Sequence, residues 1–183
     1  LMSDAALLGS DSPGLGGYQY GYWWCLPLDW LLARLPIVVL EFIAAAVNLI
    51  IFAPRLRLAP SIVFEVDALS VQLVLVADHA RSTDMQIVHH ALDALPQLAA
   101  LRPRLRVRHT YGEGNPGADC ASRGKGAALR VLCAGLGVRA QRVEVPEEAH
   151  AFVRDVCALA MARGGKDGPA PRKDGAVPST QAV

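Results

Sequence analysis

The sequence predicts an α/β protein, in which strands and helices alternate along the chain and pack in layers. Residues 104–111 alternate between basic and apolar side chains, which is typical of a strand with one apolar face. Residues 35–53 are almost continuously apolar, which favours a long buried helix. Of the 183 residues, 52% are hydrophobic and 19% are charged, so one domain with a substantial core is expected.

In the first half of the chain, Asp4 is expected on a first strand. Residues 16–28 combine glycine with aromatic side chains, which predicts one or two strands or a hairpin. Pro36 opens a long helix that is expected to end at about residues 55–57. The next elements expected are a strand over 61–67 and helices over about 68–77 and 84–95.

The segment 109–124 joins a strand to a short helix. Asn115 is a good N-cap, and Pro116 suits the first helical position, where a missing N–H costs nothing. Gly124 fits the position just after the last turn. Asp119 is therefore expected about one turn into this helix, facing whatever the preceding loop encloses.

Beyond this helix the pattern stays helical to about Leu136, and a last amphipathic helix is expected from Pro146. Glu147 and Glu148 lie in its first turn, where the helix dipole favours acids. From Gly164 the composition turns to glycine, proline and polar residues. The domain organisation expected is a core over 1–125, a C-terminal helical extension over 126–163 and a disordered tail over 164–183.

Charge and cysteine content exclude several classes of protein. The net charge is only +1, so any nucleic-acid footprint must be local. The four cysteines are widely spaced without a C-x-x-C pair, which argues against a zinc knuckle and a disulfide scaffold. They favour a reducing, intracellular location, cytoplasmic or nuclear. The first twenty residues show no pattern of a signal peptide.

The apolar run over 35–53 is also near the length of a membrane span. Glu41 and Asn48 interrupt it and lie seven residues apart, so they share one helical face. A carboxylate on that face is expensive in lipid. A helix buried in a sheet protein without membrane contact is favoured, and a small membrane protein anchored by 35–53 remains the less favoured alternative.

Four acids occupy positions that a metal site needs: Asp4 on a strand, Glu41 in an apolar helix, Asp67 at a strand end and Asp119 in a helix. In α/β proteins, sites form at the carboxyl ends of strands and at helix starts. Mg²⁺ takes carboxylate oxygens, and two such ions about 4 Å apart catalyse phosphoryl transfer. This pattern predicts a two-metal centre.

Each acid also has a structural interpretation. Asp67 fits the N-cap of a helix that begins at Ala68, and Asp119 fits a surface acid favoured by the helix dipole. Asp4 fits a solvated acid near the chain end. Glu41 is hardest to explain this way, because a charge in an apolar helix needs a partner.

Two further acids compete for these roles. Asp11 competes with Asp4, but its Ser-Pro-Gly context indicates a turn. Glu65 shares a strand face with Asp67 and is the weaker candidate.

The segment from Arg102 to Arg130 is rich in basic residues. It contains seven Lys and Arg and only two acids, which gives a local charge of about +5. A phosphate backbone binds such a patch, although charged edge strands also use it to prevent aggregation. Arg123 and Lys125 are the better phosphate candidates because they adjoin Asp119.

The four acids, in this order, resemble the D-E-D-D set of ribonuclease H. The resemblance is closest to the ribonuclease H domains of retroelement polyproteins, of the tyrosine-recombinase (DIRS-type) or Gypsy-type branch, and it covers about residues 1–125. The motifs that carry it are Ser3-Asp4-Ala5-Ala6, Gly14-Leu-Gly-Gly-Tyr18, Leu40-Glu41-Phe42, Val66-Asp67-Ala68 and His109-x5-Asn115-x2-Ala118-Asp119-x2-Ser122-Arg123.

This resemblance implies a ribonuclease H-like fold, a five-stranded mixed sheet flanked by helices. It implies Mg²⁺-dependent cleavage (with Mn²⁺ as a substitute) of the RNA strand of an RNA–DNA hybrid, and a reverse transcriptase encoded upstream. Asp4, Glu41 and Asp67 would hold metal and Asp119 would complete the second site, with Asn115, Arg123 and Lys125 as nucleic-acid contacts.

The alternative is the same fold without catalysis, as a remnant that binds nucleic acid or is only structural. Ala6 stands where the family usually has serine, and only three residues precede Asp4. His109 matches a spacing of retroelement versions, and a buried sheet histidine is an equal interpretation of it.

Overall fold

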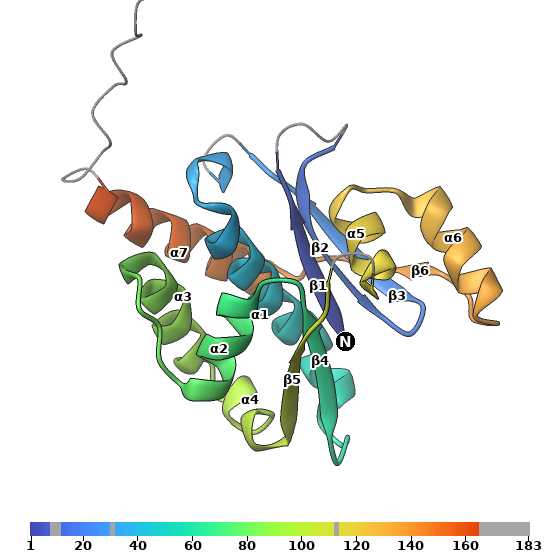
Figure 1. Ribbon diagram of the computed structural model, residues 1–183, viewed down its shortest axis with the longest axis horizontal. Helices are drawn as coiled ribbons and strands as arrows, with labels where there is room; N and C mark the ends of the chain where they lie inside the picture. Colours follow the sequence, from blue (N-terminus) through green and yellow to red (C-terminus); the bar gives the residue numbers. More distant parts are fainter. Residues whose placement is uncertain (8–11, 30–31, 112–113, 165–183) are drawn as a thin grey trace, which may run out of the picture.

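The structure is a computed structural model that describes residues 1–7, 12–29, 32–111 and 114–164 (Figure 1). Asp11 and the tail over 165–183, for which a turn and disorder are expected, lie outside the described residues. The protein is an α/β fold built on one mixed sheet with the strand order β5-β4-β1-β2-β3-β6. The strands are β1 (Met2–Ala6), β2 (Gly14–Gln19), β3 (Tyr22–Pro27), β4 (Ile62–Val66), β5 (Leu105–His109) and β6 (Gln141–Arg142).

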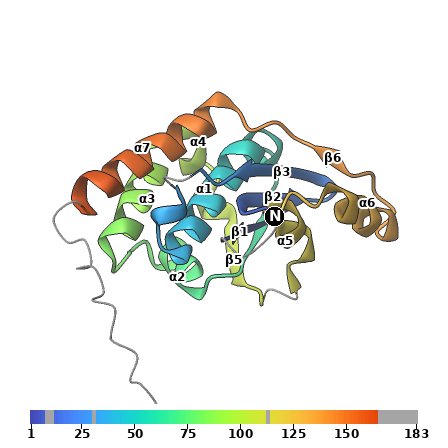
Figure 2. The same ribbon diagram turned by 90° about the horizontal axis from the view of Figure 1, so that it is seen from above.

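Helices cover both faces of the sheet, so the α/β class and the mixed sheet flanked by helices are confirmed (Figure 2). The longer ones are α1 (Ile37–Leu56), α2 (Leu69–Ala77), α3 (Thr83–Asp93), α6 (Gly126–Gly135) and α7 (Glu147–Gly164). The shorter ones are η1 (Leu32–Arg34), α4 (Pro96–Ala99), η2 (Arg102–Arg104) and α5 (Pro116–Ser122).

The expected number of five strands is wrong, because a sixth strand, β6, extends the sheet beyond β3. β6 has two residues, and Gln141 and Arg142 pair in parallel with Tyr22 and Trp23. A two-residue strand is too short for an alternating pattern, so nothing in the local sequence indicates it. It also brings part of the segment after residue 125 into the same sheet as the core.

Helix α1 is the centre of the core, and the hydrophobic residues of β1, β2, β4, α3 and α7 pack around it. Asn48 is completely buried and holds this helix to the sheet. Its amide nitrogen donates to the carbonyl of Met2 (2.7 Å), and its amide oxygen accepts from Trp24 Nε1 (2.7 Å). Glu41, seven residues earlier, meets β1 as well, through the N–H of Ala5.

By length and composition, Ile37–Leu56 is apolar enough to cross a membrane, but 78% of its most apolar window is buried inside the protein. The core contacts of Asn48 explain a polar residue in this helix without any lipid. The prediction of a central helix within a sheet protein is therefore confirmed for the fold.

Three glycines of β2 allow helices to approach the sheet closely on both faces. A Cβ at Gly14 or Gly16 would overlap the backbone of Ser122 in α5. A Cβ at Gly17, on the opposite face, would overlap the side chain of Asn48 in α1. The Gly14–Tyr18 motif thus sets how near α5 and α1 lie to the central strands.

Candidate functional site

The structure brings Asp4 and Asp67 together through strand pairing. β1 and β4 run parallel, and Ser3 lies opposite Val66. Asp4 and Asp67 each follow these paired residues by one position, so they lie at the same level of neighbouring strands, Asp4 in the middle of β1 and Asp67 just after the end of β4. Asp67 does not cap α2, because the N-cap residue is Ala68, so the structural interpretation of Asp67 loses its main support.

Glu41 reaches the same place from α1, and its electrostatics show which groups surround it. The pKa of its carboxyl is raised to about 9, first by burial and then by the negative charges of Asp4 and Asp67, while the N–H of Ala5 acts in the opposite direction. A carboxyl with this pKa is protonated at neutral pH. It becomes an anion there only when a cation stabilises the charge.

Asp4 is 7% exposed and receives a hydrogen bond on Oδ2 from Ser122 Oγ, at 2.5 Å. Burial raises the pKa of Asp4, the bond from Ser122 lowers it, and the charges of Asp119 and Asp67 raise it. The pKa of Asp4 responds to Asp119 and Asp67, and that of Glu41 responds to Asp4 and Asp67, so Asp4 links the four predicted acids electrostatically.

Ser122 is the residue of this site that the sequence did not single out. It is completely buried on α5, three residues after Asp119, whose carbonyl its hydroxyl also contacts at 3.1 Å. The sequence shows Ser122 within the Asn-x2-Ala-Asp-x2-Ser-Arg motif but does not show that it contacts Asp4. That contact follows from the close packing of α5 on β2.

The side chain of Asp119 is 43% exposed, whereas Asp4 is buried. Arg123, one helical turn later, donates from Nε to its Oδ1 at 2.7 Å. This bond is the main cause of the raised pKa of the Arg123 guanidinium. Arg123 also lowers the pKa of Asp4, so it is the cation that borders the acid cluster on the α5 side.

Asn115 occupies the predicted N-cap position of α5, but its side chain makes no cap hydrogen bond. It is 1% exposed and donates from Nδ2 to the carbonyl of Ser3 at 3.0 Å. Its amide therefore ties the start of α5 to β1, next to Asp4. This burial does not favour a direct nucleic-acid contact by Asn115, whereas Lys125 is exposed.

His109 supports the backbone of the site. It lies opposite Val66 in the β4–β5 ladder, and its Nε2 is 2.8 Å from the carbonyl of Asp67. Because a carbonyl only accepts, Nε2 is the donor. The ring also packs edge-on against Tyr111, with centroids 4.8 Å apart. His109 thus fixes Asp67, which favours the structural interpretation of this residue.

The competing acid Glu65 lies two residues before Asp67 on β4, opposite Arg108 of β5 in the strand register. Of the other predicted basic residues, Arg104 belongs to η2 and donates to the carbonyls of Arg57 and Ala59, both at 2.8 Å. Arg104 therefore stabilises the end of α1 and is not a phosphate ligand.

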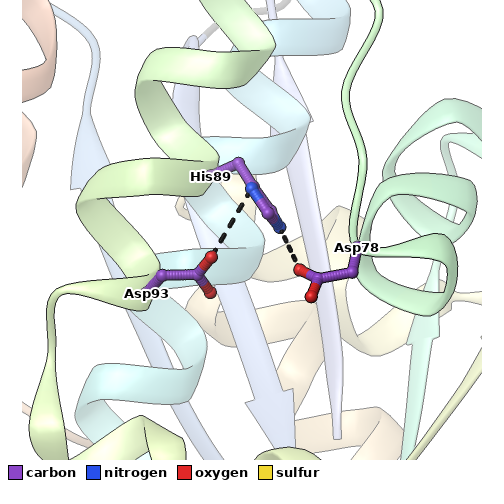
Figure 3. A group of neighbouring side chains, drawn as sticks. All are labelled: Asp78, His89 and Asp93. Carbon is purple, nitrogen blue, oxygen red and sulfur yellow. Dashed lines mark ion pairs between the residues drawn. The ribbon is translucent and has the colours of Figure 1, made fainter.

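A second cluster lies on the helical side, where Asp78, His89 and Asp93 place their ligand atoms within 4.8 Å of one another (Figure 3). His89 Nε2 is 3.0 Å from Asp78, and His89 Nδ1 is 3.6 Å from Asp93. Arg102 contacts both carboxylates, Asp93 at 2.6 Å. The protein itself thus supplies a cation to this group.

Comparisons of the chain with protein-family models, with curated proteins and with solved structures found no match. Inferences about function therefore depend on the residues and their arrangement.

The carboxylates of Asp4, Glu41, Asp67 and Asp119 are oxygen ligands of the type that hard cations such as Mg²⁺ prefer. Among the described residues, however, the group whose ligand atoms all lie within 4.8 Å of one another is Asp78, His89 and Asp93. Two of the acids, Asp4 and Glu41, have raised pKa values partly because other acids face them. A bound cation would relieve that repulsion.

Proposed function

We propose that this protein is a ribonuclease H-like nuclease that hydrolyses the RNA strand of RNA–DNA hybrids with divalent metal, as part of a retroelement protein. The observation that supports this most directly is the convergence of Asp4, Glu41, Asp67 and Asp119 on one cluster. A sheet of β1 to β5 with helices on both faces, all within residues 1–125, agrees with the fold that the motifs imply.

In this proposal Asp4, Glu41 and Asp67 hold metal, and Asp119 completes a second position. Two Mg²⁺ ions would supply an activated water and a stabilised leaving oxygen. Ser122 orients the carboxylate of Asp4, and His109 fixes the backbone of Asp67. Glu41 loses a proton when the site is loaded, because its carboxyl is neutral without a cation.

The proposed substrate is an RNA–DNA hybrid that is recognised through its shape and its 2′-hydroxyls. Arg123 and Lys125 lie four and six residues after Asp119, and Lys125 is exposed, so both would contact backbone phosphates, Arg123 beside the cleaved bond and Lys125 farther from it. A reverse transcriptase domain upstream would supply such hybrids. The proposed location is intracellular and reducing, and it agrees with four cysteines that are all free thiols.

The test is a cleavage assay on a labelled RNA–DNA hybrid with Mg²⁺, with Mn²⁺ and with EDTA. We expect cleavage of the RNA strand only, and only with metal. Asp67→Asn should lower the cleavage rate by more than roughly 10–100-fold, which is the loss expected when a residue that only supports a metal ligand is replaced. Asp155→Asn, at an exposed position of α7, is the matched control and should retain activity. Cleavage that is absent in wild type, or unchanged in Asp67→Asn, contradicts the proposal.

A second candidate is the same fold as a nucleic-acid-binding remnant without catalysis. The ion pair between Arg123 and Asp119 favours it, because this pair already neutralises the fourth acid. Binding of the hybrid without cleavage under any divalent metal, in a protein that is folded by circular dichroism, would support this candidate over the nuclease.

A further inference from the structure

The segment from α5 to β6 carries a charge that the rest of the chain does not. Between Cys120 and Val143 there are five basic residues and no acidic one, whereas the whole chain has a net charge of +1. The remainder therefore carries a net charge of −4. A positive segment on an otherwise acidic protein marks a surface that selects negative partners.

Two cations of this segment, Arg130 and Arg142, lie near one aromatic residue of β3, Trp23. Gly126 packs on the indole, since a Cβ there would lie 3.3 Å from a ring carbon. The same Cβ would be 3.9 Å from Nη1 of Arg130. The guanidinium of Arg142 lies 5.5 Å from the centroid of the ring, within the range of a cation–π contact.

The same segment is fixed rigidly to the core. β6 pairs with β3, and Leu129 and Cys133 of α6 form a small core with Tyr18 and Trp23. The turn between α5 and α6 is closed by a hydrogen bond from the N–H of Lys125 to the carbonyl of Cys120, at 2.8 Å. The backbone that carries these cations is therefore held against the sheet before any partner binds.

These cations continue directly from the acid cluster. Arg123 pairs with Asp119 at one end, Lys125 is in the next turn, and Arg130 and Arg142 lie beyond it around Trp23. Lys125, Arg130 and Arg142 are exposed. The row of positive charge thus begins at the candidate metal site and leads away from it.

We propose that Lys125, Arg130 and Arg142 form a basic arm that binds the phosphate backbone of the nucleic acid at a distance from the cleaved bond. The inference rests on the proposed function for the identity of the ligand, an RNA–DNA hybrid, but not for the hydrolysis. A row of separated charges on a rigid surface fits an extended polyanion, which neutralises several cations at once. This proposal assigns a function to α6 and β6, which lie after the region of residues 1–125 that contains the motifs.

The experiment measures binding of the full chain to a fluorescent RNA–DNA hybrid in EDTA, by anisotropy, at several salt concentrations. We expect Lys125→Gln/Arg130→Gln to bind at least about tenfold more weakly, and its salt slope to fall by about two, since each phosphate contact contributes roughly 0.9. Arg81→Gln makes the same kind of charge change at an exposed position outside the arm and should bind as wild type does.

Binding within twofold of wild type, with an unchanged salt slope, overturns the basic arm. The single variant Arg130→Glu, at an exposed position, repeats the measurement if the double variant does not fold. Binding of phosphatidylserine vesicles without binding of the hybrid also overturns it, in favour of a membrane surface.

If wild type binds but does not cleave, and the double variant loses binding, the arm stands and the nuclease proposal fails. If the double variant binds and cleaves the hybrid as wild type does, the nuclease proposal stands and the basic arm fails.

Discussion

Replacing Glu41 with glutamine tests the electrostatics of the acid cluster in the metal-free protein. Glutamine keeps the shape of the side chain and an oxygen for the N–H of Ala5, but it carries no proton to lose. The variant therefore removes the titration and leaves the packing of α1. We expect Glu41→Gln to stabilise the metal-free protein at neutral pH, although it removes a residue of the site.

The magnitude follows from the pKa, which is raised from an ordinary value of 4.5 to about 9 in the folded protein. A carboxyl whose pKa is raised by folding contributes stability that is fully present below about pH 4.5 and is lost as the pH rises through 9. One pKa unit corresponds to about 1.4 kcal/mol. The loss at pH 7 is thus about 3 kcal/mol, and glutamine, which is neutral in both states, avoids it.

The assay is urea denaturation of wild type and Glu41→Gln in EDTA at pH 5, 7 and 9. The advantage of the variant should be below about 1 kcal/mol at pH 5, about 3 at pH 7 and about 6 at pH 9. Added Mg²⁺ should reverse the order, because it stabilises wild type more than the variant. A variant that is less stable than wild type at every pH, or a difference that does not grow with pH, refutes this account of Glu41.

Three further substitutions test other contacts of the site and fold. Ser122→Ala should lower the affinity for Mg²⁺ and the cleavage rate about 10–100-fold by releasing the carboxylate of Asp4, with rescue by Ser122→Thr, measured by titration of metal against activity. Gly16→Ala should cost about 3 kcal/mol of unfolding free energy, because its Cβ would overlap backbone in α5; an unchanged urea midpoint would contradict this packing. Asn48→Leu should cost about 2–4 kcal/mol by leaving buried partners, including Trp24 Nε1, unsatisfied. A helix lying in lipid would instead gain from the same change, so a stabilised variant would favour the membrane alternative.

Much of the fold could be predicted from local signals. Pro36 and the apolar run placed α1, which begins at Ile37, and the proline after Asn115 placed the start of α5. The hairpin of β2 and β3 turns at Tyr20 and Gly21, both with positive φ, within the segment 16–28 for which one or two strands or a hairpin were predicted. β6 could not be predicted, because its pairing with β3 depends on where α6 directs the chain.

For the site, the sequence showed which residues carry charge but not which partners they meet. Arg102 and Arg104 belong by composition to a basic patch, yet their side chains bind acids and carbonyls of the protein itself. Ser122 carries no charge, yet it contacts Asp4. These partners are set by the approach of distant segments, which residue spacing does not report. The glycines of β2 form a motif in the sequence, but the sequence does not show that α5 packs against them.

Two acidic clusters in this protein differ in their source of positive charge, and this difference bears on the proposal that the cluster around Glu41 holds metal. Asp78 and Asp93 share Arg102, which also contacts His89, so the protein neutralises that cluster without an ion. Glu41 responds mainly to burial and to the charges of Asp4 and Asp67. Among the described residues, Arg123 is the cation that lowers the pKa of Asp4 in this cluster, and its side chain is bound to Asp119. The buried acids therefore have two ways to avoid mutual repulsion, a proton or a divalent cation, and the choice between them is what the Glu41→Gln titration measures.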